Sequence, residues 1–257
     1  MTLKARLAAD ETLYTAWSGV PDALTVEIVA KQGFDAVTLD MQHGGHSEDS
    51  VLRSVPAIQA AGKPALVRIP VSRFDMASRA LDFGAEAVIA PMVNSVADAR
   101  AFAAAMKYPP LGERSWGPTY AFPRHGKGDQ AEWLHESNQR TLAFAMIETR
   151  AALEALDGIL DVPGIDGIFV GPSDFSIAWT NGGTVDSTLE DMMETVASIA
   201  ERTRKAEKHA AIYIMDPKIA GRMAKMGYRL LAMGSEHTLI GIGAKNLLAD
   251  IRKSVGA

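Results

Sequence analysis

Two carboxylates, Glu148 and Asp174, each follow a short apolar run, at 141–147 and 164–170. They are 26 residues apart, about the length of one strand–loop–helix–loop unit in a parallel α/β protein. We therefore expect both side chains at the carboxyl-terminal ends of successive strands. Hard oxygen ligands that converge in this way suit Mg²⁺ or Mn²⁺, which keep water or substrate oxygens in their other positions. The alternative is that both carboxylates cap the helices that follow them.

The segment 39–46 reads Leu-Asp-Met-Gln-His-Gly-Gly-His and ends another apolar run. Its paired glycines let the backbone turn close to a ligand. We interpret His43 as a candidate general base, because a histidine titrates near neutral pH. The alternatives are a loop histidine with a structural hydrogen bond, and a metal-binding pair formed with His46.

Arg68 lies inside the apolar sequence Val-Arg-Ile-Pro at 67–70. A buried guanidinium is costly unless it is paired. At the carboxyl end of a strand its planar fork suits a substrate carboxylate or enolate. An internal salt bridge with a neighbouring carboxylate is the alternative.

The turn Gly171-Pro172-Ser173-Asp174 leads into a helix-like segment. The free N–H groups at such a turn can accept an anion. Together with the arginine and the histidine, this turn suits a small 2-oxo acid that binds through its carboxylate and keto oxygens. A metal ion would then stabilise the enolate that forms when a C–C bond breaks or a methyl proton leaves.

The elements that must position these residues alternate along the whole chain. Amphipathic, helix-like stretches with apolar residues at i, i+3, i+4 and i+7 separate the apolar runs; they cover 22–32, 48–61, 96–107, 189–208 and 218–226. The candidate strands are 14–18, 36–39, 65–69, 87–90, 142–147, 167–170, 210–214 and 229–232. Eight strands separated by helices, with no break in composition, predict a single (β/α)₈ TIM barrel over residues 1–257. A doubly wound open sheet is the alternative.

One segment, 108–140, interrupts this alternation. It is rich in proline and glycine, with aromatic and basic residues among them. Long loops in compact domains are usually functional or disordered, and the aromatic content argues against disorder. We expect a long inserted loop that either covers the active site or contacts another subunit.

The composition excludes several classes of function. The net charge of −5, with dispersed basic residues, gives no indication of nucleic-acid binding. The absence of cysteine excludes disulfides and cysteine nucleophiles. No apolar stretch approaches the ~20 residues of a membrane span, and no signal peptide is visible. We expect a cytoplasmic protein that binds neither nucleic acid nor membrane.

At these residues the chain closely resembles the HpcH/HpaI aldolases, metal-dependent pyruvate aldolases that act on 4-hydroxy-2-oxo acids. The resemblance covers nearly the whole chain. It depends on six motifs: Leu-Asp-Met-Gln-His at 39–43, Val-Arg-Ile-Pro at 67–70, Leu-Asp-Phe-Gly-Ala-Glu at 81–86, Ala-Pro-Met-Val at 90–93, Met-Ile-Glu-Thr at 146–149 and Gly-Pro-Ser-Asp-Phe-Ser at 171–176.

The resemblance implies a role for individual residues. It implies that Glu148 and Asp174 bind the metal, and that Arg68 holds the pyruvyl oxygens. His43 would be the general base, directly or through a metal-bound water, with Asp82 as its orienting partner. The substrate-binding turn, Gly171 to Ser173, would contribute the Ser173 N–H to the pyruvate carboxylate. The role of Asp82 depends on the resemblance alone.

The implied activity is that of a class II pyruvate aldolase. It cleaves 4-hydroxy-2-oxo acids reversibly to pyruvate, or a related 2-oxo acid, and an aldehyde. The implied cofactor is Mg²⁺ or Mn²⁺, with Co²⁺ or another divalent ion as alternatives. An oxaloacetate-type β-keto acid decarboxylase would use the same site. A third alternative is a binding barrel without activity. The joint presence of His43, Arg68, Glu148 and Asp174 counts against it.

Two departures and one property of assembly accompany the resemblance. Gln42 stands where the family often has glutamate, and 114–118 reads Arg-Ser-Trp-Gly-Pro where well-known members have an Arg-Gly-Val-Gly-like stretch. The bulk of Trp116 there affects the expected aldehyde specificity more than the pyruvate half. The resemblance also implies a homo-oligomer, a hexamer built from two trimers, with parts of the site crossing the interface.

Overall fold

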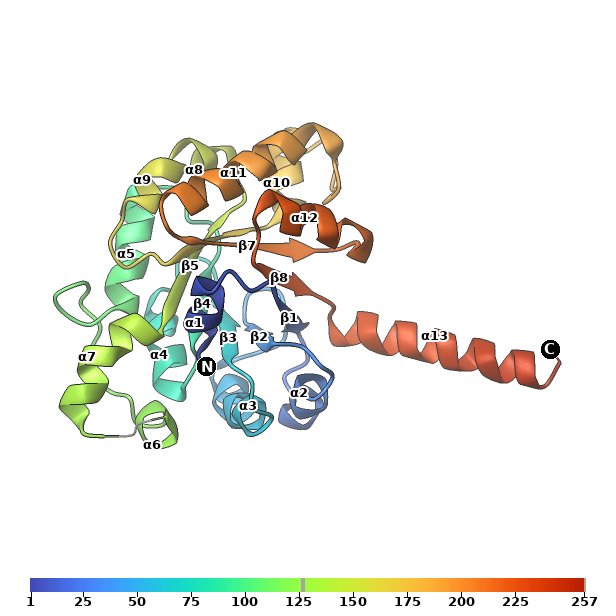
Figure 1. The fold of residues 1–257 in the computed structure, drawn as a ribbon, viewed down its shortest axis with the longest axis horizontal. Helices are drawn as coiled ribbons and strands as arrows, with labels where there is room; N and C mark the ends of the chain where they lie inside the picture. Colours follow the sequence, from blue (N-terminus) through green and yellow to red (C-terminus); the bar gives the residue numbers. More distant parts are fainter. Residues whose placement is uncertain (126–127, 257) are drawn as a thin grey trace.

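The chain folds as a closed barrel of eight parallel strands, in the order β1 to β8, in the computed structural model that describes residues 1–125 and 128–256 (Figure 1). Strand β1 pairs with both β2 and β8, which closes the sheet on itself. This confirms the predicted (β/α)₈ barrel and excludes the open sheet. The strands are β1 (Leu13–Ser18), β2 (Ala36–Asp40), β3 (Ala65–Arg68), β4 (Ala87–Ala90), β5 (Leu142–Ile147), β6 (Gly167–Val170), β7 (His209–Ile214) and β8 (Leu230–Met233).

Helices surround the sheet, and the connections that follow β1 to β7 return the chain to the amino-terminal end of the next strand. They are α1 (Leu3–Ala8), α2 (Ala23–Ala30), α3 (Glu48–Ala60), α4 (Asp75–Phe83), α5 (Val96–Met106), α6 (Ala121–His125), α7 (Gln130–Arg140), α8 (Arg150–Glu154), α9 (Leu156–Leu160), α10 (Pro172–Trp179), α11 (Met193–Lys205), α12 (Ala220–Met226) and α13 (Glu236–Ser254), with 3₁₀ turns η1 (Glu190–Met192) and η2 (Pro217–Ile219). Several helices begin at a side-chain cap, such as Ser47, which forms a capping box with Ser50.

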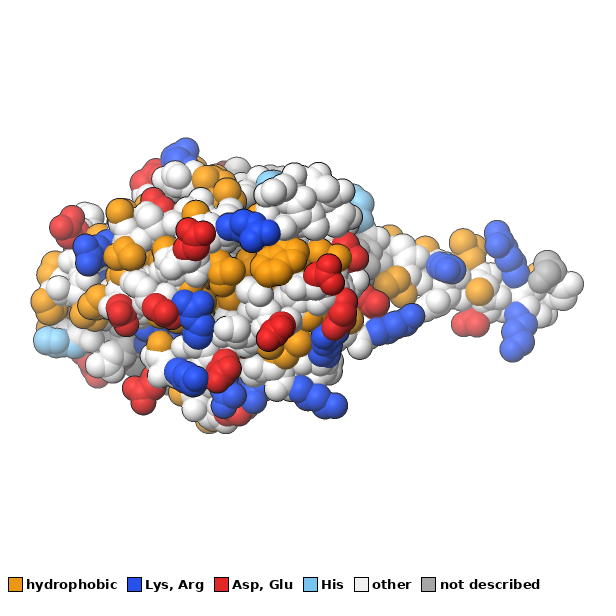
Figure 2. All heavy atoms as spheres, turned by 90° about the horizontal axis from the view of Figure 1, so that it is seen from above, with side chains coloured by type: hydrophobic (Ala, Val, Ile, Leu, Met, Phe, Trp, Pro, Cys, Tyr) orange, Lys and Arg blue, Asp and Glu red, His pale blue; other side chains and the backbone are white. Residues whose placement is uncertain are grey.

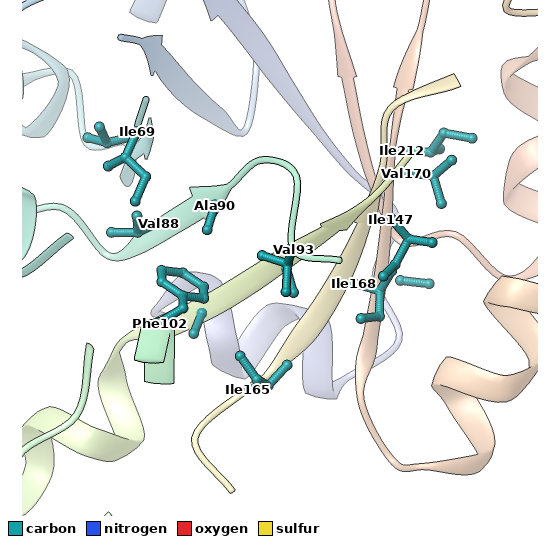
Figure 3. Packing of buried hydrophobic residues seen from close by; sticks show 14 of the residues in the cluster. Ile69, Val88, Ala90, Val93, Phe102, Ile147, Ile165, Ile168, Val170 and Ile212 are labelled. Carbon is teal, nitrogen blue, oxygen red and sulfur yellow. The ribbon is translucent and has the colours of Figure 1, made fainter. Parts of the chain in front are cut away.

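The hydrophobic core has two layers. The larger layer lies between strands and helices, and Figure 3 shows Val88, Ile147 and Ile168 of the sheet and Phe102 of α5 among its residues. The smaller layer fills the barrel interior. Its residues include Leu13 and Phe144 of the strands, and α1 joins this layer at the amino-terminal end of the barrel. The barrel is thus filled from its amino-terminal end, so that its carboxyl-terminal mouth is left for chemistry.

Helix α13 departs from the usual arrangement. Figure 1 shows it projecting from the barrel as a separate arm with the carboxyl terminus at its tip. Apolar side chains along it are widely exposed, among them Ile240 (67%), Leu247 (63%) and Ile251 (49%) (Figure 2). Tyr14, which faces outward from β1, is 43% exposed. The outer face that an eighth helix normally covers is therefore open beside β1.

The segment 108–140 contains two helices, α6 and α7, rather than a continuous loop. It connects the end of α5 to the start of β5, so it lies at the amino-terminal end of the barrel. Backbone hydrogen bonds from Glu113 to Ala104 and from Leu142 to Glu86 fix both of its ends there. The expectation that it covers the active site is wrong within one chain, because a helix-to-strand connection lies opposite the mouth. Contact with another subunit stays a prediction. No helix in the described part of the chain is long and apolar enough to cross a membrane.

Candidate active site

Arg68 and Asp40 form a buried ion pair at the mouth of the barrel. Strands β2 and β3 pair these two residues in register. Arg68 Nε donates to Asp40 Oδ1 at 2.8 Å, and Nη2 donates to Oδ2 at 2.6 Å. Trp17 Nε1 donates to the same Oδ2 at 3.2 Å, and the guanidinium carbon lies 4.9 Å from the Trp17 ring centre. The salt-bridge alternative for Arg68 is therefore confirmed. A substrate can still reach the guanidinium, because Arg68 also lines the cavity described below.

The carboxylate of Asp40 also organises the loop that carries His43. It accepts hydrogen bonds from the backbone N–H groups of Gln42 and Gly44, each at 3.0 Å, and from that of His43 at 3.4 Å. Burial opposes its ionisation, but the Arg68 guanidinium, the backbone N–H of Gln42 and the Trp17 N–H hold the pKa of Asp40 below its usual range. Asp40 is therefore a carboxylate with fixed partners.

Glu148 follows β5 directly and is only 2% exposed. Its Oε1 accepts a hydrogen bond from Met92 N at 2.8 Å. Met92 has a positive φ of 53°, an uncommon conformation for a side-chain-bearing residue, which presents this N–H to the carboxylate. Burial and the nearby Asp174 charge raise the pKa of Glu148 to about 7, although the Met92 N–H and Arg68 act in the opposite direction.

Asp174 lies in the first turn of α10, which begins just after β6. It is exposed at the mouth, close enough to Glu148 for the two charges to interact. The turn before α10 approaches Glu148 so closely that a Cβ at Gly171 would clash with Glu148 Oε2. The N–H groups of Ser173 and Asp174 lie in the first turn, where a helix has no backbone acceptor for them. The mouth thus combines two carboxylates with a helix terminus that favours anions.

A cavity of about 230 Å³ lies beside these groups, at the mouth of the barrel. That volume suits a small organic acid better than a larger ligand. The cavity is polar on the side of the arginine, the histidine and α10. It is apolar where residues of the barrel interior line it. Its lining residues are Trp17, His43, Arg68, Met146, Phe169, Gly171, Pro172, Ser173, Asp174, Tyr213 and Met215.

The residues present fit a divalent cation of the magnesium type. Two acidic side chains lie together here, and burial and the Asp174 charge raise the pKa of Glu148, so that a cation beside both would favour their ionised forms. Within residues 1–125 and 128–256, no group of three or more His, Cys, Asp or Glu side chains is placed to hold a metal. The protein thus offers two carboxylates, Glu148 and Asp174. Mg²⁺ and Mn²⁺ accept such sets, because substrate oxygens and water complete their octahedron.

The two histidines of the 39–46 segment have different surroundings. His43 is exposed and lines the cavity, as a general base for a bound substrate must. His46 is buried, with Nε2 at 2.9 Å from Ser18 Oγ and Nδ1 at 3.1 Å from Ser50 Oγ. Because both of its ring nitrogens have these partners, His46 does not form a metal-binding pair with His43.

Asp82 lies apart from the other predicted site residues. It is near the end of α4, shortly before β4 begins at Ala87, and thus at the opposite end of the barrel from His43. There it accepts a hydrogen bond from Arg114 Nη2 at 2.6 Å. Burial raises the pKa of Asp82, and the Arg114 guanidinium offsets part of that rise. Within one chain Asp82 therefore cannot orient His43, and its predicted role requires a second chain.

Several residues of the site have no role in the sequence-based predictions, among them Asp40, Trp17 and Tyr213. Asp40 belongs to the motif at 39–43, and its position one strand before Arg68 is the signal that could have marked it as the partner of the arginine. Trp17 and Tyr213 form part of the cavity wall, with ring centres 5.2 Å apart in an edge-to-face arrangement. Aromatic residues in a buried strand carry no sequence signal that separates a cavity wall from core.

The fold is a (β/α)₈ barrel whose mouth places two carboxylates and a helix amino terminus beside a cavity. The profile of the HpcH/HpaI aldolase/citrate lyase family matches residues 14–241, and the chain belongs to this family. It is 33% identical, over 92% of both chains, to a hydroxypyruvate/pyruvate aldolase of Rhizorhabdus wittichii. It is 31% identical, over 96% of this chain and 92% of the other, to a 4-hydroxy-2-oxo-heptane-1,7-dioate aldolase of Klebsiella pneumoniae.

Solved structures agree with this assignment. The crystal structure of an HpcH/HpaI aldolase from Desulfitobacterium hafniense has a TM-score of 0.88 at 27% identity, over 98% of this chain and 97% of the other. The chain is therefore an enzyme of the aldolase type, as the resemblance predicted. The relatives named above are aldolases, so the comparisons do not favour the decarboxylase alternative.

Proposed function

We propose that the protein is a divalent-metal-dependent class II aldolase that reversibly cleaves 4-hydroxy-2-oxo acids to pyruvate, or a related 2-oxo acid, and an aldehyde. The observation that carries the proposal is the buried Glu148 carboxylate with its raised pKa, next to Asp174 and beside a cavity that Arg68 lines. A site that leaves negative charge uncompensated is arranged for a cation that arrives with the ligand.

Each group at the mouth has a task in this reaction. Glu148 and Asp174 would hold Mg²⁺ or Mn²⁺, with Co²⁺ or another divalent ion as alternatives. When bound, such an ion supplies Lewis acidity toward the 2-oxo group. The N–H groups of Ser173 and Asp174 would receive the substrate carboxylate, with Gly171 and Pro172 allowing its close approach. Arg68 would stabilise the negative charge that develops on the 2-oxo oxygen.

His43 would move the proton in the bond-breaking step. It takes the proton of the 4-hydroxyl group, the C3–C4 bond breaks, and its electron pair forms the pyruvate enolate as the aldehyde leaves. A proton delivered to C3 then gives pyruvate, and His43 is the group that can return it. The exposed position of His43 at the cavity suits this exchange of protons with substrate and solvent.

We further propose that the protein works as a homo-oligomer, a hexamer built from two trimers. The exposed apolar side chains of α13 and the open face beside Tyr14 support assembly, because monomers rarely leave such surfaces in water. Light scattering should show a multimer, and Leu247→Glu with Ile251→Glu should shift it toward smaller species. A monodisperse monomer of the unmodified protein contradicts the assembly.

The reaction itself is tested by a comparison of two substrates. Pyruvate release from a panel of 4-hydroxy-2-oxo acids, with several divalent metals, should identify cleavage. His43→Ala should suppress cleavage and the exchange of pyruvate methyl protons. Decarboxylation of oxaloacetate should change much less, because it removes no hydroxyl proton. Equal loss of both activities removes His43 as the base, and no pyruvate release from any member of the panel refutes the aldolase.

A further inference from the structure

A buried carboxylate anchors α13 to the mouth of the barrel. Glu236, the first residue of this helix, is 2% exposed. Its Oε1 accepts a hydrogen bond from Ser18 Oγ at 2.5 Å, and its Oε2 accepts one from Gly19 N at 2.9 Å. Ser18 Oγ also lies 2.9 Å from Nε2 of the buried His46. A chain of polar groups therefore joins the projecting helix, the end of β1 and the loop after β2.

The loop that carries His43 rests on the same end of β1. Gly45 N donates to Gly19 O at 2.8 Å. Gly44 is so close that a Cβ there would lie 2.9 Å from Gly19 Cα. On its other side the loop is held by Asp40, which accepts the Gly44 N–H at 3.0 Å. The loop that carries His43 is thus held between two supports: the Asp40 carboxylate and the anchored end of β1.

A carboxylate is an expensive way to attach a helix. An ionised carboxylate loses several kcal/mol of hydration when it is buried, whereas an apolar side chain would attach α13 without that loss. The amino terminus of α13 favours the negative charge, and two donors satisfy its oxygens. Because hydrogen bonds are directional, they define the position of Ser18 and Gly19 more narrowly than apolar packing would.

We propose that Glu236 is a positioning residue for His43. By fixing Ser18 and Gly19 it fixes the loop that holds the base. Because Glu236 belongs to α13, the position of the base then depends on the position of this helix relative to the barrel. The kinetic part of the inference depends on the proposed role of His43 as the base. Misplacing a reacting group by about 1 Å can cost about 10²-fold in rate.

The test uses the full-length protein with a change at the anchor and a matched control. Glu236→Ala removes both acceptors. Tyr228→Phe is the control, because it also deletes one buried hydrogen bond, from Tyr228 Oη to Val196 O at 2.8 Å, away from the mouth. Should Glu236→Ala not fold, Glu236→Gln keeps the shape and replaces one acceptor oxygen with a donor group. Light scattering confirms that variants of equal oligomeric state are compared.

Two independent measurements decide the outcome. Hydrogen–deuterium exchange of the peptide that covers 41–46 should be faster in the Glu236 variant and unchanged in the control. Aldol cleavage and pyruvate methyl exchange should fall about 10²-fold in kcat, whereas the KM for pyruvate and the rate of oxaloacetate decarboxylation should change little.

Wild-type protection of 41–46 in the Glu236 variant overturns the inference, and so does an equal loss of all three reactions. Failure of the proposed function is a different result. In that case the unmodified enzyme shows neither cleavage nor exchange, and the protection of the loop alone then decides whether Glu236 positions it.

Discussion

Two buried carboxylates at opposite ends of the barrel, Asp166 and Glu148, have opposite surroundings. At the amino-terminal end, Asp166 accepts hydrogen bonds from Lys4 Nζ at 2.9 Å and from Lys107 Nζ at 2.7 Å. Burial opposes its ionisation, yet the two ammonium groups hold the pKa of Asp166 below its usual value. At the mouth, burial and Asp174 raise the pKa of Glu148 to about 7. Two ammonium groups compensate the charge of Asp166, whereas burial dominates at Glu148.

The difference separates stability from function. Lys107 is 1% exposed and also donates to the carbonyl oxygens of Asn138 and Thr141, so that it fastens α7 and β5 to the amino-terminal end. A charge satisfied in this way has no capacity left for a ligand. Glu148 accepts a hydrogen bond from the backbone N–H of Met92, and a cation that bound beside it would favour its ionised form. A buried carboxylate with a raised pKa beside a cavity is therefore a candidate binding site for a cation.

The largest effect should come from removing a carboxylate at the mouth. We expect Asp174→Ala to lower metal-stimulated pyruvate release by about 10³-fold or more. The free energy of unfolding in the absence of metal should stay the same or rise, because a repulsive neighbour of Glu148 is lost. Asp191→Ala, which removes an exposed acid from η1, is the control. Full turnover of Asp174→Ala, or of the unmodified enzyme after exhaustive chelation, would contradict the assignment.

The second effect lies at the amino-terminal end of the barrel, where a substitution should lower stability and leave activity unchanged. Lys107→Met leaves Asp166 buried with one cation fewer, which should lower the free energy of unfolding by about 4 kcal/mol. The kcat of the folded fraction should not change, because Lys107 is remote from the mouth. Lys205→Met, which breaks an exposed pair with Glu201, should cost less than about 1 kcal/mol. Denaturant titrations with activity assays check both; a loss of kcat without a loss of stability refutes the division.

The sequence predicts the barrel well because its signal is local. Each strand is a short apolar run between helices, and strand ends such as Val170 and Ile147 fall where the pattern places them. The position of Glu148 follows from the strand alone. The sequence also identifies α3 and α5, since their apolar residues recur with helical spacing.

What the sequence does not reveal is long-range. The pairing of Arg68 with Asp40 requires the register of β2 against β3. The anchor between Ser18 and Glu236 joins the first strand to the last helix. The location of 108–140 depends on which end of the barrel a connection occupies, and composition carries no such information.

The third prediction uses the pH dependence of Glu148. Its folded-state pKa of about 7 exceeds the ordinary value of 4.5, so protonation favours the folded state. The stability it contributes is full below pH 4.5 and is lost as the pH rises through 7. At about 1.4 kcal/mol for each pKa unit, the metal-free protein should lose about 3 kcal/mol across this window.

Glu148→Gln supplies the control for this prediction. It should abolish that part of the pH dependence, and a saturating divalent ion should weaken it in the unmodified protein. The comparison uses the difference between the two proteins, because other groups titrate in both. If the two metal-free proteins show the same change in stability from pH 4.5 to 7, Glu148 is already ionised and compensated, and the contrast between the two ends fails.

The last and smallest effect concerns Arg68, which shares features of both ends. Like Lys107 it is buried in an ion pair, and like Glu148 it lies at the mouth. Lysine can keep one bond to Asp40 but cannot reproduce the planar fork. The N–H groups of Arg68 that do not bond to Asp40 are free to stabilise the enolate charge. If they do so, Arg68→Lys should lower both kcat and kcat/KM by about 10²-fold, with a modest loss of stability. If Arg68 is only a structural partner of Asp40, unfolding will become easier while the kcat of the folded enzyme stays unchanged. Measuring the free energy of unfolding and kcat on one preparation therefore decides whether this arginine acts in catalysis, as Glu148 is proposed to do, or only in stability, as Lys107 is expected to do.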